Sequence, residues 1–174
     1  MSSTDNTKWY RLSHATRQAV VQRYTISGYP VNEADPNSVL HWRIFAKCVL
    51  PDDNSRIVTL DMMPGQDSRT GVLAVTEAPD ESSQAGVADV TERAATEITV
   101  ESLLDLLESK GRNRFIYDDT GSGCRFWCHT VLGDLERIKL VSDGAISRFD
   151  TYVAEQSQEN TARFPLPTRE GTFY

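Results

Sequence analysis

Residues 40–49, LHWRIFAKCV, form the clearest β-strand pattern in the chain and indicate its fold class. Every second residue from the leucine onward is apolar, whereas His41, Arg43 and Lys47 fall on the alternate face. Such alternation is typical of a strand with one face against a core and a more polar opposite face. We therefore expect a sheet whose apolar face is covered by other elements.

Neighbouring stretches predict further strands on both sides of this one. Residues 19–27 (AVVQRYTIS), 56–63 (RIVTLDMM) and 71–78 (GVLAVTEA) are rich in β-branched and apolar residues. Turn-forming segments separate them, PDDNS at 51–55 and a Pro-Gly pair at 64–65. Short strands joined by such turns predict an antiparallel β-meander.

Two stretches with helical periodicity follow the strands. Thr99 is a suitable N-cap for a helix that ends near Gly111, with an apolar stripe of Val100, Leu103, Leu104 and Leu107. The loop DDTGSG (118–123) leads into a second helix, whose apolar positions at helical spacing are Cys124, Trp127, Cys128, Val131, Leu135 and Ile138. A shorter third helix follows a turn at 143–144. The predicted fold class is α+β, an antiparallel meander packed against two to three helices.

The chain length favours a single domain over residues 1–174. Residues 79–97 are rich in acidic and small polar residues with little apolar periodicity, which predicts a flexible surface insertion. The polar ends, residues 1–15 and 156–174, are expected to be loose.

The charge balance excludes several classes of partner. The formal net charge is −7, and lysines and arginines are scattered singly, so we expect neither nucleic acid nor an anionic membrane surface as a partner. The N-terminal residues lack the pattern of a secretory signal, and no long uncharged apolar run occurs, which predicts a cytoplasmic protein. An odd count of three cysteines favours reduced thiols over a disulfide framework.

Cys124 is the leading candidate for chemistry. The unpaired N–H groups and the dipole at a helix N-terminus stabilise a thiolate and lower the pKa of the thiol from about 8.5. Gly121 and Gly123 allow a sharp turn, and free N–H groups beside the sulfur can hold an oxyanion when it attacks a carbonyl. The alternative is that Cys124 is a core residue, because free cysteines are often buried.

A nucleophilic thiol needs a base, and the chain has three histidines. His14 lies near the N-terminus and His129 falls on another face of the helix that begins at Cys124, so His41 is the expected base. Asp61 can accept a hydrogen bond from the far imidazole nitrogen and fix the tautomer. Alternation places His41 opposite the apolar face, so a solvated surface histidine is the alternative, and Asp61 can instead begin a turn.

Three further residues are candidates for substrate binding. Arg125 points off the apolar stripe of its helix and can bind an anionic group, and Arg43 shares the polar face of its strand with His41. Trp127 lies close to Cys124 in sequence, although its place on the stripe also fits a core residue.

Metal and nucleotide sites lack the necessary patterns. Cys124, Cys128 and His129 have donor atoms, but on one helix they supply at most two well-directed ligands, and no second pair completes a tetrahedron. The sequence GSGC has neither the spacing nor the lysine of a phosphate-binding loop. We therefore expect no metal and no cofactor.

A strand that opens with histidine, HWRIF (41–45), precedes a loop that delivers cysteine to a helix, GCRFW (123–127). This order resembles the circularly permuted papain-like hydrolases, which include the PPPDE peptidases and the lecithin retinol acyltransferase relatives. The resemblance spans roughly residues 40–140 and implies His41 as base and Cys124 as nucleophile, with Asp61 as the orienting residue. The neighbours of the cysteine, a glycine and an arginine, differ from the asparagines that are typical of PPPDE members.

The phrases HWRIF, LDMMP (60–64) and GCRFW also resemble an uncharacterised family of filamentous fungi associated with specialised metabolism. The leading hypothesis is a thiol-dependent acyl hydrolase or acyltransferase that acts on a small molecule or peptide. A second hypothesis is a cofactor-free cyclase or isomerase of a fungal natural product. A third is a non-catalytic binding module, in which Cys124 packs in the core and the face with His41 and Arg43 meets a partner.

Overall fold

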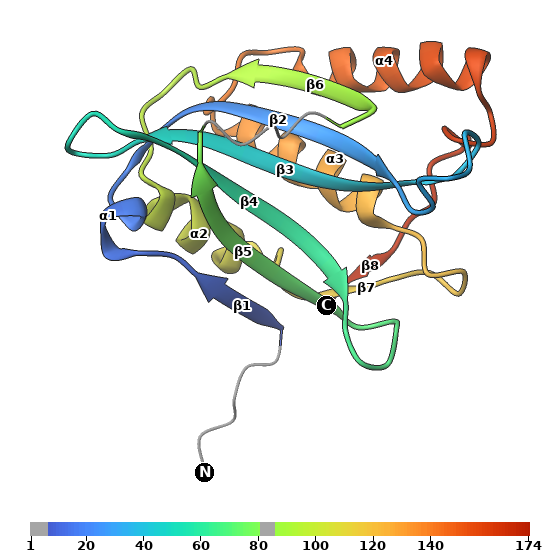
Figure 1. Ribbon diagram of the computed structural model, residues 1–174, viewed down its shortest axis with the longest axis horizontal. Helices are drawn as coiled ribbons and strands as arrows, with labels where there is room; N and C mark the ends of the chain where they lie inside the picture. Colours follow the sequence, from blue (N-terminus) through green and yellow to red (C-terminus); the bar gives the residue numbers. More distant parts are fainter. Residues whose placement is uncertain (1–6, 81–85) are drawn as a thin grey trace.

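A six-stranded sheet with four helices makes up the chain in the computed structural model, which describes residues 7–80 and 86–174 (Figure 1). The strand order is β1-β5-β4-β3-β2-β6, and a separate two-stranded sheet pairs β7 with β8. The strands are β1 Lys8–Arg11, β2 Val20–Pro30, β3 Leu40–Val49, β4 Ser55–Pro64, β5 Gly71–Pro79, β6 Ala88–Arg93, β7 Phe115–Ile116 and β8 Thr172–Phe173. The helices are α1 His14–Arg17, α2 Val100–Ser109, α3 Cys124–Arg137 and α4 Ala145–Glu159.

The centre of the sheet is the meander that the sequence predicts. Strands β2 to β5 pair with their chain neighbours in antiparallel fashion, and β3 covers the same residues as the predicted strand at 40–49. Strand β1 adds to β5 in parallel at one edge, and β6 adds to β2 at the other. The predicted α+β class with a mostly antiparallel sheet is therefore confirmed.

The apolar face of the sheet is covered by α2 and α3, while α4 lies beside β6 (Figure 1). Alternation along β3 buries Trp42 and Ile44 in this layer. Helix α2 begins as predicted, since the Thr99 side chain accepts a hydrogen bond from the Ser102 N–H at 3.2 Å. Its leucine stripe is fully buried against the sheet.

The predicted insertion at 79–97 contains an ordered strand, β6, in the part that the structure describes. Its sequence, ADVTER, lacks clear apolar alternation because it lies at an edge of the sheet and buries only Ala88 and Glu92. Glu92 is buried because the Arg148 side chain of α4 donates to both of its oxygens, at 2.8 and 2.7 Å. Residues 81–85 lie outside the described part.

The ends of the chain also differ from the expectation of loose termini. Within residues 7–15, β1 joins the main sheet, while residues 1–6 lie outside the described part. At the other end, α4 extends to Glu159 and β8 pairs with β7. The polar tail is fixed by a few apolar anchors, because Phe164 packs edge-on against Trp42 and Phe173 lies 5.0 Å from Phe115 between ring centroids.

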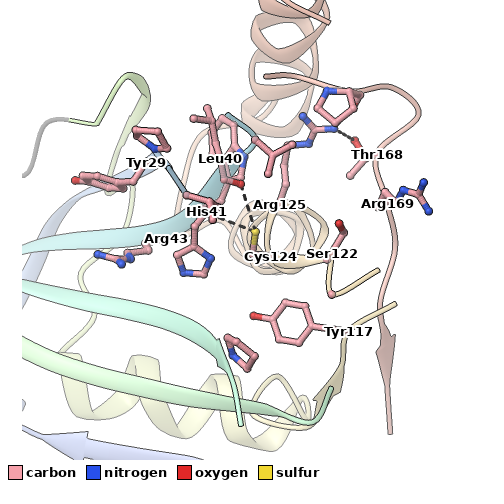
Figure 2. Close-up of a pocket in the computed structure, with 18 of the residues that line it drawn as sticks. Tyr29, Leu40, His41, Arg43, Tyr117, Ser122, Cys124, Arg125, Thr168 and Arg169 are labelled. Carbon is pink, nitrogen blue, oxygen red and sulfur yellow. Dashed lines mark hydrogen bonds between the residues drawn. The ribbon is translucent and has the colours of Figure 1, made fainter. Parts of the chain in front are cut away.

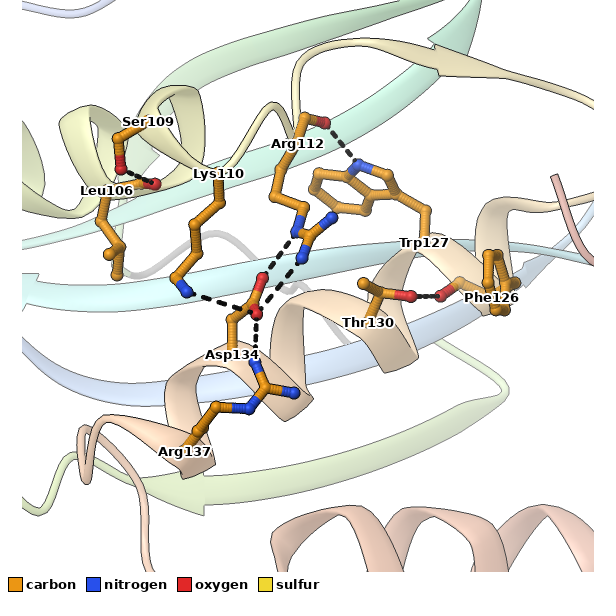
Figure 3. Close-up of polar contacts among 9 residues, drawn as sticks. All are labelled: Leu106, Ser109, Lys110, Arg112, Phe126, Trp127, Thr130, Asp134 and Arg137. Carbon is orange, nitrogen blue, oxygen red and sulfur yellow. Dashed lines mark hydrogen bonds and ion pairs between the residues drawn. The ribbon is translucent and has the colours of Figure 1, made fainter. Parts of the chain in front are cut away.

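Helix α3 is fixed in place by a buried carboxylate, Asp134 (Figure 3). Its oxygens lie 2.6 Å from Arg112 Nε, 2.8 Å from Arg137 Nη1 and 3.7 Å from Lys110 Nζ. Burial alone raises the pKa of Asp134, but hydrogen bonds and charge from Arg112 outweigh it and hold the pKa below the usual range. The backbone oxygen of Arg112 also accepts from Trp127 Nε1 at 2.8 Å, so two contacts join α3 to the segment after α2.

Candidate active site

Strands β3 and β4 separate at one end of the sheet, and the candidate site lies where they part. Their pairing runs from Val49–Ser55 to Ile44–Leu60 and stops there. Each strand remains paired with its outer neighbour: β3 pairs with β2 as far as Leu40, and β4 pairs with β5 as far as Pro64. Figure 1 shows the two strands diverging beyond this point. Their facing backbone groups therefore need partners other than each other.

Two side chains supply those partners. The Trp42 N–H of β3 donates to Cys124 Sγ at 3.4 Å, and Leu40 O lies 3.8 Å from the same sulfur. On the opposite strand, the buried Tyr117 hydroxyl donates to Met62 O. Figure 2 shows the sulfur between these strands. Cys124 thus occupies the space between β3 and β4 rather than the hydrophobic core.

A glycine sets the start of the helix that carries the sulfur. Gly123 has a φ of +146°, a backbone conformation that L side chains rarely adopt. A Cβ at this position would lie 3.0 Å from the Phe115 ring, so the close approach also requires glycine. No side chain caps α3, which leaves its first N–H groups unpaired by a cap. The sequence prediction that α3 begins at Cys124 is confirmed.

His41 is held by a carboxylate on the neighbouring strand. Its Nε2 lies 2.6 Å from Asp61 Oδ1, and the other carboxylate oxygen lies 2.9 Å from Arg43 Nε. Asp61 is only 7% exposed, so the carboxylate of this pair is shielded from solvent. The remaining ring nitrogen, Nδ1, is free to face the sulfur, and Figure 2 shows the imidazole beside Cys124.

The surroundings of His41 favour its protonated form. Burial on its own lowers the pKa of the imidazole, but hydrogen bonds with Asp61 and Cys124 and their negative charge outweigh burial and raise the pKa to about 9. His41 lies on the polar face of β3, opposite the core, as alternation predicts. The sulfur reaches this face because it lies in the gap between the strands. The structure therefore brings together the three residues that the sequence predicted as catalytic: Cys124, His41 and Asp61.

A cavity of about 530 Å³ opens onto these residues. One wall comes from the end of β2 and the turn between β2 and β3, with Tyr29, Val31 and Val39, and another from the loop before α3. Residues of the C-terminal segment complete it. The lining residues that were not predicted from the sequence include Tyr117, Arg163, Thr168 and Arg169. Arg163, Thr168 and Arg169 belong to the C-terminal segment, which its polar composition predicted to be loose. The short aromatic run at 115–117 was the sequence feature that could have identified Tyr117.

The predicted substrate-binding residues have different positions. Arg43 lines the cavity, pairs with Asp61 and lies 5.2 Å above the Tyr29 ring. Arg125 also lines the cavity, but it is buried and its Nη2 donates to Pro165 O and, at 3.2 Å, to Thr168 Oγ1. Trp127 is completely buried in the core and does not line the cavity, so its predicted contact with substrate is corrected.

Cys124 differs from the other two cysteines in its accessibility. Cys48 and Cys128 are buried, and burial raises the pKa of Cys48 to about 11 and that of Cys128 well above its usual value. Cys124 is half-buried and faces the cavity. Among residues 7–80 and 86–174, no group of three or more His, Cys, Asp or Glu side chains is arranged to bind a metal.

The fold and site define an α+β protein with a thiol, an imidazole and a carboxylate side by side at the edge of a cavity. Residues 24–174 match the family described as Domain of unknown function (DUF7770), and the chain belongs to this family. No curated protein and no solved structure matches the chain. No helix in the described residues is long and apolar enough to cross a membrane.

Proposed function

We propose that the protein is a thiol-dependent acyl hydrolase or acyltransferase with Cys124 as its nucleophile. The observation that supports this most is the placement of His41 between the Asp61 carboxylate and the Cys124 sulfur. A base that is oriented by a carboxylate and in contact with a thiol is the arrangement that nucleophilic catalysis needs. The cavity beside the sulfur gives a substrate access to it.

The reaction begins from an ion pair in which the thiol proton of Cys124 has already passed to His41. The resulting thiolate is stabilised by the imidazolium, by the Trp42 N–H and by the N-terminus of α3. It attacks the carbonyl carbon of an amide, ester or thioester, forming a C–S bond while the carbonyl oxygen becomes an oxyanion. The uncapped N–H groups of the first turn of α3, beginning with that of Cys124, are the donors for this oxyanion.

The tetrahedral intermediate then collapses with loss of the leaving group, which takes the proton from His41. Asp61 stabilises the imidazolium throughout and keeps its Nε2 oriented. The acyl group remains on the sulfur as a thioester. Water then releases it in a hydrolase, or a second nucleophile in an acyltransferase, and in either case His41 removes the proton of the attacking group. No cofactor is required for these steps.

The chain order of base and nucleophile supports a relationship to the permuted papain-like hydrolases. Strand β3 carries His41, the meander and α2 follow, and α3 begins with Cys124. A small molecule or peptide is the proposed substrate. The resemblance of HWRIF, LDMMP and GCRFW to proteins of filamentous fungi favours a reaction in specialised metabolism.

Thiol reactivity tests this proposal without knowledge of the substrate. We expect iodoacetamide at pH 7 to modify Cys124 at least tenfold faster than glutathione, because contact with an imidazolium stabilises the thiolate. Peptide mapping should find Cys48 and Cys128 unmodified, since both are buried. The variant His41→Gln should slow the modification of Cys124 about tenfold. A wild-type rate equal to that of glutathione, unchanged in this variant, would rule out the thiol mechanism.

A cofactor-free cyclase or isomerase is the second candidate. The specific observation in its favour is that the Asp61–His41 pair can move a proton to or from a substrate without the sulfur. This candidate predicts that Cys124→Ser retains turnover of a substrate found by screening, whereas His41→Gln does not. The acyl mechanism predicts that both variants lose it.

The binding module remains a third proposal, because the sulfur also has a structural role between Leu40 and Trp42. It predicts a specific ligand that is bound without turnover and an unreactive thiol at Cys124. The alkylation rates above separate it from the acyl mechanism.

A further inference from the structure

The cavity is lined by more cationic than anionic side chains, although the chain has a net charge of −7. Asp61 is the one carboxylate among its described lining residues. It is paired with an arginine, and Asp118, just outside the lining, lies 3.5 Å from another. The cationic lining residues are Arg43, Arg125, Arg163 and Arg169. A local excess of positive charge in a cleft concentrates anions there despite the negative charge of the whole chain.

Two of these arginines have no acidic partner in the described part of the chain. Arg43 pairs with Asp61 and Arg169 with Asp118, but neither Arg125 nor Arg163 lies within ion-pair distance of a carboxylate. A guanidinium stays charged at all physiological pH values, so both sites retain a full positive charge.

Arg125 is also incompletely hydrogen-bonded. The residue is 7% exposed, and its Nη2 donates to Pro165 O and Thr168 Oγ1. Its Nε is buried without a hydrogen-bond partner, and the Nε of Arg163 is in the same condition. Buried guanidinium groups that lack acceptors are unfavourable, and an anion in the cavity would place acceptor oxygens and negative charge beside both of them. Carboxylates and phosphates match the planar donor pattern of a guanidinium.

Other residues that line the cavity are apolar and exposed. Val31 and Val39, on either side of the turn between β2 and β3, and Met63 near the end of β4 all line it and are about half exposed or more. Exposed apolar side chains at the rim of a cavity favour contact with an apolar part of a ligand. The cavity is therefore lined both by arginines and by exposed apolar side chains, and Cys124 faces the same space as Arg125 (Figure 2).

We propose that the substrate of this site is an amphipathic acyl compound with an anionic group, a carboxylate or a phosphate, that binds Arg125 and Arg163. Its apolar part contacts Val31, Val39 and Met63. This inference rests on the proposed function, because it names the substrate class of the same site. Arg125 directly follows Cys124 at the start of α3 and both residues line the cavity, so the anionic group and the reacting carbonyl occupy the same cavity.

Calorimetric binding of small anions tests the proposal without turnover. Cys124→Ser protein is titrated with butyrate, butyl phosphate and butanol, which share an alkyl chain and differ in charge. We expect at least one anion to bind and butanol not to bind; the tighter of the two anions identifies the carboxylate or the phosphate as the natural group. The additional substitution Arg163→Gln should weaken the binding of that anion roughly tenfold or more, as expected for loss of a charged hydrogen bond.

Arg163 is the preferred position for substitution, because Arg125 also holds the C-terminal segment through Pro165 and Thr168. Arg11→Gln on the edge strand β1 is the matched control and should bind as the parent does, since this exposed arginine lies on a distant strand. Absence of binding by both anions, or equal binding in the Arg163→Gln protein, would refute the anion site. A reactive Cys124 with no anion site would leave the acyl mechanism standing, whereas an anion site beside an unreactive Cys124 would remove that mechanism alone.

Discussion

Replacement of Asp61 by asparagine tests the electrostatic basis of the site. The pKa of His41 is about 9, roughly 2.5 pH units above its usual 6.5, which corresponds to about 3 kcal/mol in favour of the imidazolium. Since burial acts in the opposite direction, the partners of the imidazole must supply more than this net amount. Asp61 is the first of them. In the Asp61→Asn protein the ring keeps a neighbour of similar shape but loses the charge, and Arg43 loses its counterion. We therefore expect the pKa of His41 to fall by about 2 pH units or more.

Histidine-selective NMR measures this change directly. The chain has three histidines, and a His41→Gln spectrum assigns the resonance of interest between pH 5 and 10. Asp150→Asn is the matched control, because Asp150 lies 3.1 Å from the ring of another histidine, His129. This control should leave the titration of His41 unchanged. If His41 in the Asp61→Asn protein still titrates above about pH 8.5, the carboxylate does not set its charge and the proposed role of Asp61 is wrong.

Three further predictions concern stability. Because the pKa of His41 in the folded state, about 9, lies above its unfolded value, the stability that protonated His41 contributes is complete below about pH 6.5 and is lost as the pH rises through 9. In urea titrations, the difference in the free energy of unfolding between wild type and His41→Gln should therefore fall by about 3 kcal/mol between pH 6 and 10. A difference that stays constant with pH would contradict this. Gly123→Ala should destabilise the fold by about 2 kcal/mol, because alanine is strained at the positive φ and its Cβ would clash with the Phe115 ring, and it should slow alkylation of Cys124. The control Gly121→Ala also has a positive φ but open space around it, so it measures the cost of backbone strain without a clash. Asp134→Asn should lower the free energy of unfolding by about 3 kcal/mol, because it leaves Arg112, Lys110 and Arg137 without their carboxylate. The exposed control Asp150→Asn should lower it little. Equal midpoints of thermal unfolding for the two variants would refute this prediction.

Local pattern was sufficient for the strands and helices that lie against the core. The alternation at 40–49 matches β3, and the glycine-rich loop before Cys124 places the start of α3 correctly. In both cases one face is buried, so the identity of every second or every third to fourth residue is constrained by packing. Strand β6 lacks this constraint, because it forms a sheet edge and is held mainly by backbone pairing with β2.

The C-terminal tail shows a second limit of local pattern. Its composition is polar, yet Phe164 fills a place beside Trp42 and Gly171 lies against the Phe115 ring, where a Cβ would approach within 2.2 Å. These are single long-range contacts that no periodicity within the tail reveals. As a result, the sequence alone did not predict Arg163, Thr168 and Arg169, which complete the cavity.

The position of His41 shows why the candidate site was only partly predictable. Alternation correctly assigns His41 to the face opposite the core, and from this alone a contact with a core-side helix is unexpected. The contact exists because β3 and β4 stop pairing after Ile44 and Leu60, and the helix start enters the gap. Where two strands separate depends on their register and on what fills the space between them, and neither is encoded in one strand.

The gap between the strands also links the structural role of Cys124 to its proposed chemical role. A backbone N–H that has lost its ladder partner needs an acceptor, and the Cys124 sulfur is the acceptor for Trp42. A thiolate accepts such a bond more strongly than a neutral thiol does, so the contact that completes the sheet is compatible with the proposed thiolate nucleophile. The structural role of Cys124 therefore does not compete with its proposed catalytic role. What distinguishes an enzyme from a binding module here is the imidazole of His41, which strand geometry alone would not require next to the sulfur.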